Sequence, residues 1–318
     1  MDLCERTCGA CGGTAFAPAI RLRELMNGPS ESFDYVRCLD CGCLQIVAIP
    51  DDMAKFYGDA YYSFASQWQS RREWLRDWLT LHGPAWLLGR FAWYRRGLWR
   101  CMDGVARSAR IIDVGCGFGH FAGRLRDFGF RNVYGIDAFI EGDSVLPNGV
   151  RIERKAIGDV AGPYDVVMMH HSLEHMPDQL ATLKIARTIM ADGGQLIIRI
   201  PVIDSWAAEH FGPDWAHLDP PRHFFLHTRR SIARLLERAN LELEGIVDDW
   251  YEFGVRGSLK VRMGHRSIAP CQLPETELAE AMASQRQAFA TGRSDSITVF
   301  ARSRAANSAP LAACASSH

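Results

Sequence analysis

From about residue 110 onward, short apolar runs alternate with stretches in which apolar residues recur at helical spacing. The apolar runs predict strands at residues 111–114, 131–137, 150–157, 163–169, 195–201, 241–250 and 294–303. The helical spacing predicts helices at residues 121–129, 180–190 and 229–240. Strands that alternate with helices in this way predict an α/β fold with helices on both faces of the sheet.

The stretch Ile111–His120, with the sequence IIDVGCGFGH, organises this half of the chain. An apolar strand runs directly into three alternate glycines, and a helical pattern follows them. Asp137 ends the next predicted strand, 18 positions after Gly119. A glycine loop before a helix, followed by an acidic residue at the end of the next strand, is how doubly wound α/β folds hold a ribose-bearing cofactor.

The glycine spacing separates two kinds of cofactor site. The dinucleotide pattern G-x-G-x-x-G needs its third glycine at position 120, which is His120. The observed pattern is D-x-G-x-G-x-G from Asp113, which resembles motif I of the class I S-adenosylmethionine (SAM)-dependent methyltransferases. The alternatives are a dinucleotide-binding domain and a glycine turn that serves packing alone.

This resemblance implies a doubly wound, mostly parallel seven-stranded sheet whose last strand is antiparallel. It also implies that Asp137 binds the ribose hydroxyls of SAM. Residue 157 lies where the chain passes the adenine, by position alone. The cofactor-binding residues implied are Asp113, Gly115, Cys116, Gly117, Gly119, Asp137, Ile157, His170 and Tyr62.

Two Cys-x-x-Cys pairs, Cys8/Cys11 and Cys38/Cys41, lie 26 residues apart near the start of the chain. Each pair is followed by glycine. Four thiolates in this spacing predict a closed, structural Zn²⁺ site within a zinc-ribbon module at residues 1–50. The alternative is a set of reduced thiols without metal. The module has four basic and six acidic residues, so we expect no nucleic-acid partner.

Residues 51–106 are rich in tryptophan and arginine, and His82-Gly83-Pro84 divides them into two predicted helices. Aromatic residues on an arginine-rich face indicate contact with a membrane surface, an anionic substrate or another subunit, unless the segment packs on its own domain. The ribbon and the tyrosine cluster at 56–64 resemble a bacterial methyltransferase family, many of whose members act on sugars or cell-surface glycans. That resemblance implies that Tyr61 and Tyr62 close the SAM pocket; core packing is the alternative.

The segment HHSLEHMPD, residues 170–178, follows the fourth predicted strand of the α/β domain at the sheet edge where ligands bind. It resembles the corresponding motif of the same family. A hydroxyl needs its proton removed as it attacks the methyl group, and histidine suits that task. We expect His175 to be the general base, with Glu174 beside it and His171 as second choice. The alternative is that these histidines cap the strand and the next helix.

Residues 202–228 form a long connection rich in Trp, His, Phe and Asp. Its P-R-H-x-x-x-x-T pattern resembles the family segment that faces the acceptor. The resemblance implies that Asp219, Arg222 and His223 contact substrate, with His223 a second candidate base. Asp219-Pro220-Pro221 lacks the following aromatic residue of the amino-methyltransferase signature, which disfavours that activity.

Composition, charge and targeting signals indicate the kind of protein to expect and its location. A hydrophobic content of 47%, a charged content of 23% and a net charge of −1 fit a globular protein without general attraction for nucleic acid. We find no signal peptide and no apolar run long enough to span a membrane. We expect a cytoplasmic location, with peripheral contact at the inner membrane face through the Trp/Arg helices as one candidate. Nothing in the sequence indicates the oligomeric state.

We therefore predict a SAM-binding domain at residues 107–304 and a disordered tail at 305–318. The predicted activity is methyl transfer to a hydroxyl, or less readily to a carbon, of a sugar or glycan-like acceptor. Two alternatives are methylation of another small molecule and a non-catalytic scaffold that binds zinc and SAM.

Overall fold

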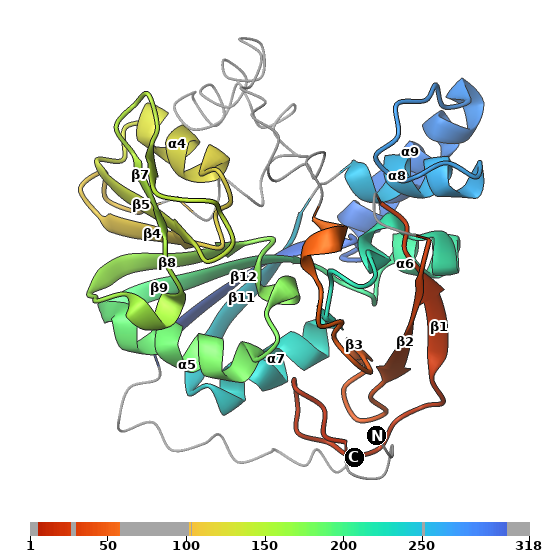
Figure 1. The fold of residues 1–318 in the computed structure, drawn as a ribbon, viewed down its shortest axis with the longest axis horizontal. Helices are drawn as coiled ribbons and strands as arrows, with labels where there is room; N and C mark the ends of the chain where they lie inside the picture. Colours follow the sequence, from red (N-terminus) through yellow and green to blue (C-terminus); the bar gives the residue numbers. More distant parts are fainter. Residues whose placement is uncertain (1–5, 27–29, 58–101, 103, 250–251, 304–318) are drawn as a thin grey trace.

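The computed structural model describes residues 6–26, 30–57, 102, 104–249 and 252–303 (Figure 1). Tyr61, Tyr62, the two Trp/Arg helices and the 305–318 tail lie outside the described residues, so the predictions made for them stay predictions. Among the described residues, no helix is both long enough and apolar enough to cross a membrane.

The main sheet has seven strands in the predicted arrangement and an eighth short strand at its edge. Its order is β11-β12-β9-β8-β4-β5-β7-β6. The pairs that join β9, β8, β4, β5 and β7 are parallel, whereas β12 runs antiparallel to both of its neighbours. The strands are β4 (Arg110–Val114), β5 (Asn132–Asp137), β6 (Ser144–Val145), β7 (Arg151–Arg154), β8 (Tyr164–His170), β9 (Met190–Pro201), β11 (Leu241–Asp249) and β12 (Ser296–Ser303). The doubly wound, mostly parallel sheet is confirmed.

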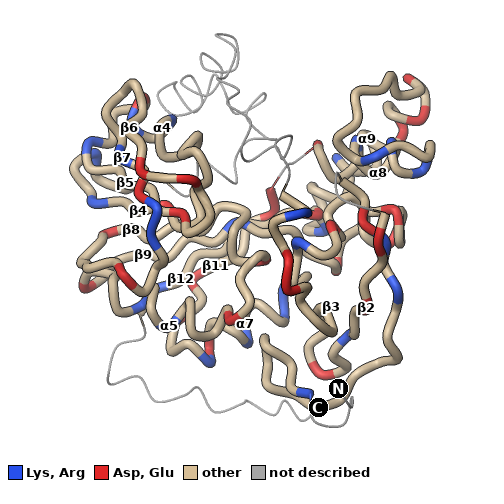
Figure 2. Tube along the Cα trace, in the orientation of Figure 1, with Lys and Arg blue, Asp and Glu red and all other residues tan. Residues whose placement is uncertain are grey.

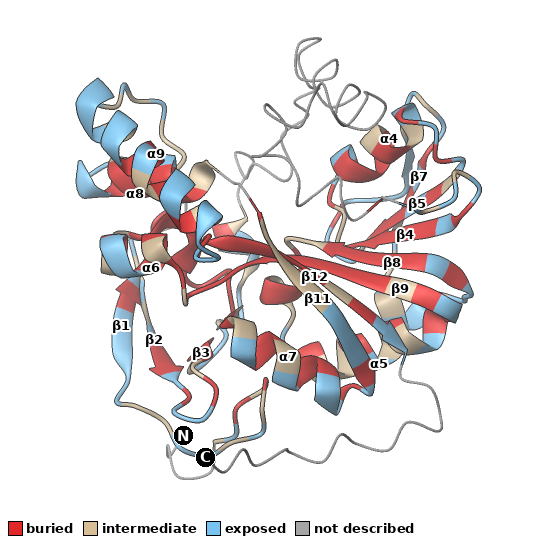
Figure 3. Ribbon diagram, turned by 180° about the vertical axis from the view of Figure 1, so that it is seen from behind, coloured by how far each residue is buried: buried red, intermediate tan, exposed pale blue. Residues whose placement is uncertain are grey.

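Helices cover both faces of this sheet, which explains why its central strands are apolar on both sides. Helix α4 (His120–Asp127) packs Phe121 and Leu125 against one face. Helices α5 (Gln179–Ile189) and α7 (Arg229–Arg238) pack on the other face (Figures 1 and 3). Strand β8 lies between the two layers, with Val167 and Met169 in one core and Val166 and Met168 in the other.

A second, four-stranded sheet joins the start of the chain to the segment after β9. Strands β1 (Ile20–Arg23), β2 (Ser32–Arg37) and β3 (Leu44–Ile46) form a meander, and β10 (Phe225–Leu226) pairs antiparallel with β3. Tyr35, Trp215 and Phe224 share the core beneath it. The cysteine-bearing module and residues 202–228 are therefore packed as one body.

Residues 202–293 contain helices that the sequence pattern did not predict. They are α6 (Trp206–Phe211), α8 (Phe253–Arg262) and α9 (Glu275–Ala290). These helices pack beside the small sheet, at one end of the main sheet (Figure 1). Acidic and basic residues are interspersed over the described chain, including β1 to β3 (Figure 2).

Candidate active site

The loop between β4 and α4 requires its glycines. Gly115, Gly117 and Gly119 have φ angles of 72°, 54° and 76°, in the left-handed region that favours glycine. A Cβ on Gly115 would lie 2.5 Å from the Cβ of Ser172, and a Cβ on Gly119 would lie 2.3 Å from Cδ1 of Ile152. The loop therefore leaves bare backbone at the carboxyl edge of the sheet, where cofactors bind in this topology.

Asp137 lies at the end of β5 and holds this loop in place. Its Oδ2 accepts a hydrogen bond from the backbone N–H of Gly117 at 2.9 Å, and its Oδ1 accepts one from Phe139 at 2.8 Å. A carboxylate oxygen can accept more than one hydrogen bond. Both oxygens therefore keep acceptor capacity for a pair of ribose hydroxyls, and the predicted ribose contact itself stays a prediction.

Asp113 is buried two residues before Gly115, and its Oδ1 has no hydrogen-bond partner among the described residues. Burial, and then the charge of Asp137, raise the pKa of this carboxyl to about 7. A cationic ligand beside it would favour the ionised form. SAM carries an ammonium and a sulfonium group, so the glycine loop, Asp113 and Asp137 fit this cofactor.

The other predicted cofactor contacts have protein partners of their own. His170 ends β8, where its ring stacks on Phe121 at 4.8 Å and its Nε2 accepts a hydrogen bond from Arg199. Burial, and then the charge of Arg199, hold the pKa of His170 well below its usual value. Cys116 is half-buried, and its Sγ donates to the Gly117 carbonyl at 3.4 Å. Ile157 begins a short 3₁₀ turn beyond β7 and packs on the core.

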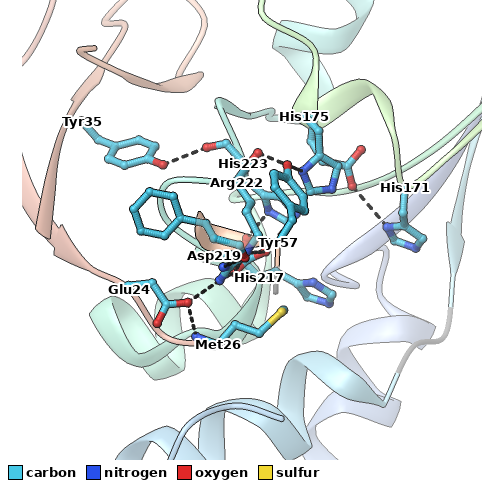
Figure 4. Close-up of polar contacts among 12 residues, drawn as sticks. Glu24, Met26, Tyr35, Tyr57, His171, His175, His217, Asp219, Arg222 and His223 are labelled. Carbon is cyan, nitrogen blue, oxygen red and sulfur yellow. Dashed lines mark hydrogen bonds and ion pairs between the residues drawn. The ribbon is translucent and has the colours of Figure 1, made fainter. Parts of the chain in front are cut away.

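Four histidines gather at the same edge of the sheet, as Figure 4 shows. His171 and His175 follow β8, and His217 and His223 come from the segment after β9. The ring centroids of His175 and His223 are 4.7 Å apart with an interplanar angle of 66°, while the rings of His171 and His217 are parallel with centroids 6.4 Å apart. The structure thus brings together the three histidines proposed as bases, and adds His217.

Hydrogen bonds fix how two of these rings present their nitrogens. Nδ1 of His175 lies 2.8 Å from the Arg222 carbonyl, and Nδ1 of His223 lies 2.7 Å from the His217 carbonyl. A carbonyl only accepts, so each Nδ1 carries the proton and each Nε2 keeps a lone pair. Burial, and then the charge of His223, lower the pKa of His175 to about 4. Both rings are thereby oriented with the lone pair of Nε2 free of the backbone.

Glu174 lies between these histidines and is buried, with 1% of its surface exposed. Its Oε1 is 3.3 Å from Nδ1 of His171, whereas its Oε2 has no hydrogen-bond partner among the described residues. Its backbone carbonyl accepts the N–H of Phe224 at 2.9 Å. The hydrogen bond from Phe224 thus connects the turn after β8 to the chain that leads into β10. Within the described part of the chain, Oε2 of Glu174 remains without a partner beside the histidines.

Arg222, predicted from the resemblance to contact substrate, makes its contacts within the protein. Its side chain is completely buried, and the predicted substrate contact stays a prediction. Its guanidinium donates to Asp219, to Glu24 and, at 2.7 Å, to the Phe56 carbonyl. Burial would raise the pKa of Asp219, but the charge of Arg222 outweighs it and holds that pKa below its usual value. Asp219 is therefore also a partner of Arg222 rather than a free substrate contact.

Sequence reasoning missed three residues of this region: Glu24, Tyr57 and His217. Tyr57 Oη lies 3.4 Å from Nδ1 of His175, and burial raises the pKa of this tyrosine above its usual value. The tyrosine cluster at 56–64 was a signal for Tyr57, and the density of histidines in 202–228 was one for His217. Glu24 is 198 positions from Arg222 in the chain, and no local pattern marks it.

The four cysteines predicted to bind a metal ion lie close together. The Sγ atoms of Cys8, Cys11, Cys38 and Cys41 all lie within 4.8 Å of one another. The Cys8–Cys41 and Cys11–Cys38 pairs are separated by 3.7 and 3.6 Å. Tetrahedral zinc with Zn–S bonds of about 2.3 Å places its sulfurs roughly 3.8 Å apart. The thiols therefore fit a tetrathiolate zinc site.

Comparisons with known proteins agree with this geometry. A model of the methyltransferase domain family matches residues 89–245. The ubiquinone biosynthesis O-methyltransferase of Xanthomonas axonopodis pv. citri is 30% identical over 164 residues, which cover 46% of this chain and 67% of that protein. The tRNA U34 carboxymethyltransferase of Methylococcus capsulatus is 24% identical over 171 residues, covering 47% of this chain and 51% of that protein.

The chain thus spans about half to two thirds of the length of these two relatives. Among solved structures, a SAM-dependent methyltransferase from Mesorhizobium loti matches with a TM-score of 0.41 and 17% identity, covering 64% of this chain and 96% of that one. The glycine loop, the acidic residue after β5 and the sheet order agree with the family match. The chain belongs to the class I SAM-dependent methyltransferases.

Proposed function

We propose that the protein transfers the methyl group of SAM to a hydroxyl of a small, sugar-like acceptor, and that His175 takes the hydroxyl proton. The observation that carries this proposal is the hydrogen bond from Nδ1–H of His175 to the Arg222 carbonyl. It fixes the tautomer whose Nε2 can accept a proton. A base at the carboxyl edge of the sheet lies on the side where the glycine loop and Asp137 are also found.

The chain's own residues account for binding, orientation and proton removal. SAM supplies the sulfonium-bound methyl group. The glycine loop and Asp137 would fix the nucleoside, and alignment of the acceptor oxygen with the methyl carbon is the main demand of an in-line displacement. As the new C–O bond forms and the C–S bond breaks, the hydroxyl proton passes to Nε2 of His175. The negative charge of Glu174 stabilises the imidazolium that results.

Three observations support the choice of acceptor. The polar histidine and carboxylate edge favours a hydroxyl-bearing acceptor, and the resemblance of the N-terminal part favours a sugar. The name of the Xanthomonas relative favours oxygen as the methylated atom and makes an acceptor of ubiquinone biosynthesis the second candidate. Along the described part of the chain, basic and acidic residues are interspersed (Figure 2), so this part gives no support to a nucleic-acid acceptor.

We also propose that the four cysteines hold a structural zinc ion. The Cys41 carbonyl accepts a hydrogen bond from Oγ1 of Thr228 at 2.7 Å, and Thr228 is the N-cap of α7. The same segment carries β10 and His223. The zinc site would therefore brace the chain that presents His223 to the acceptor edge, and four protein ligands would leave no open position for catalysis.

Replacement of His175 by alanine tests the proposed base. We expect SAM affinity to be retained and turnover to fall roughly 10²- to 10⁴-fold, because only the proton acceptor is lost. The matched controls are His171→Ala and His223→Ala. A large loss in His223→Ala with a few-fold loss in His175→Ala would move the base to the segment after β9. Mild effects in all three variants would refute a histidine base.

A further inference from the structure

Glu174, His175 and His223 form a compact group of metal-ligating atoms outside the cysteine site. One carboxylate oxygen and one ring nitrogen from each histidine lie within 4.8 Å of one another. Glu174 and His175 follow β8, and His223 comes from the segment after β9, so the group spans two parts of the fold. Figure 4 shows His175 and His223 side by side. We propose that Glu174, His175 and His223 bind a divalent transition-metal ion, separate from the zinc held by the cysteines.

The Nδ1–H groups of His175 and His223 make the kind of hydrogen bond that metal-ligating histidines usually make. A ligating histidine usually donates its other ring N–H to a backbone carbonyl or a carboxylate, which fixes its tautomer and orientation. His175 and His223 each make such a bond through Nδ1, to the carbonyls of Arg222 and His217 at 2.8 and 2.7 Å. Each Nε2 is left with its lone pair for an ion.

The carboxylate supplies an independent observation. Glu174 is 99% buried, and its Oε2 has no hydrogen-bond partner among the described residues. Its Oε1 is held at 3.3 Å by Nδ1 of His171, in the manner of ligating carboxylates that are themselves hydrogen-bonded. A buried carboxylate oxygen without a partner is costly, and a cation bound at the cluster would satisfy it.

The neighbouring charges favour Glu174 over Asp219 as the ligand. Asp219 is also close, with its Oδ2 at 3.9 Å from Nε2 of His223, but both of its oxygens accept hydrogen bonds from Arg222. Ligand atoms around one zinc lie roughly 3.0–3.5 Å apart, so closing on an ion needs side-chain shifts of about an ångström. A small movement of the Glu174 carboxylate, whose Oε2 has no partner among the described residues, can provide part of this shift without breaking the Nδ1 hydrogen bonds of the two histidines.

Two imidazoles and one carboxylate bind zinc, iron, cobalt or nickel and leave coordination positions open. An open position would take the acceptor hydroxyl; this consequence, unlike metal binding itself, rests on the proposed function. One lone pair cannot hold both a metal ion and a proton. His175 would therefore be the base in the metal-free protein and a ligand in the metal-loaded protein, where the ion would polarise the hydroxyl instead.

Zinc content of the purified full-length protein tests the inference. After dialysis against zinc and removal of excess ion, we expect Glu174→Gln and His223→Ala to hold one zinc ion per chain fewer than the wild type. The matched control is His210→Ala, which removes an exposed histidine on α6 and should leave the zinc content unchanged. Glu174→Gln keeps the side-chain volume, so its result stands even if His223→Ala fails to fold.

Equal zinc content in the wild type, Glu174→Gln and His223→Ala would overturn the metal site. In that event a turnover loss in His175→Ala still supports the base, so the two proposals can fail separately. A zinc loss in His210→Ala as large as in Glu174→Gln would also overturn it, because the extra ion would then be bound at the surface.

Discussion

Asp137 is expected to bind both ribose hydroxyls of SAM. Its two carboxylate oxygens already accept backbone hydrogen bonds from Gly117 and Phe139 at 2.9 and 2.8 Å. Two ribose hydroxyls would add one charge-assisted hydrogen bond to each oxygen. Replacing Asp137 by alanine removes both acceptors and the negative charge at once.

The magnitude follows from the number of bonds lost. Hydrogen bonds to a charged group contribute about 1.5–3 kcal/mol each, so the two ribose bonds amount to about 3–6 kcal/mol. At about 1.4 kcal/mol per tenfold change in affinity, Asp137→Ala should weaken SAM binding roughly 10²- to 10⁴-fold. Asp137→Asn keeps one oxygen acceptor and the side-chain volume, so its loss should be smaller.

Titration calorimetry with SAM measures this effect directly. The matched control is Asp165→Asn, because Asp165 also accepts a backbone hydrogen bond, from the N–H of Arg110 at 2.7 Å, but lies at the start of β8. Asp165→Asn should leave SAM affinity unchanged. Unchanged affinity in Asp137→Ala, with a thermal unfolding midpoint like that of the control, would refute the ribose contact.

Three further predictions concern other parts of the molecule. Cys8→Ser should lower both zinc content and thermal stability, which metal analysis and calorimetry can measure; full stability without metal would contradict the structural zinc site. Because burial raises the pKa of Asp113 to about 7, a proton must leave before this carboxylate can pair with a cation. SAM affinity should therefore fall as the pH drops below about 7, by about tenfold per pH unit at most, and Asp113→Asn should abolish that dependence in binding titrations. Arg222→Leu should lower the free energy of unfolding by about 3–5 kcal/mol, because Asp219 and Glu24 would be left buried and unpaired; a denaturant-unfolding loss below about 1 kcal/mol would contradict this role.

The turn of the glycine loop and the position of Asp137 were predictable because their determinants are local in sequence. The loop must turn at positive φ at Gly115, Gly117 and Gly119, and Asp137 lies at the end of the neighbouring strand. Backbone sterics and strand pairing therefore produce a pattern that a single sequence displays. The cysteine pairs were predictable for the same reason.

The acceptor half depends on contacts between distant segments, and there the sequence was less informative. The resemblance of the P-R-H-x-x-x-x-T segment implied that Arg222 contacts substrate, and no local pattern indicated its partners within the protein. Its partner Glu24 lies on another part of the chain, and the two are buried together. Strand β10 is only two residues long, so it has no periodicity to reveal its pairing with β3.

The measurement that tests the central claim most directly is the fate of a deuterated methyl group. The purified protein is incubated with SAM bearing a CD₃ group and with a metabolite extract, and labelled products are identified by mass spectrometry and NMR. We predict a small product that carries the CD₃ group on an oxygen, formed by the wild type and strongly reduced in His175→Ala. A label found only on carbon or nitrogen, or no labelled product from protein that binds SAM, would contradict hydroxyl methylation.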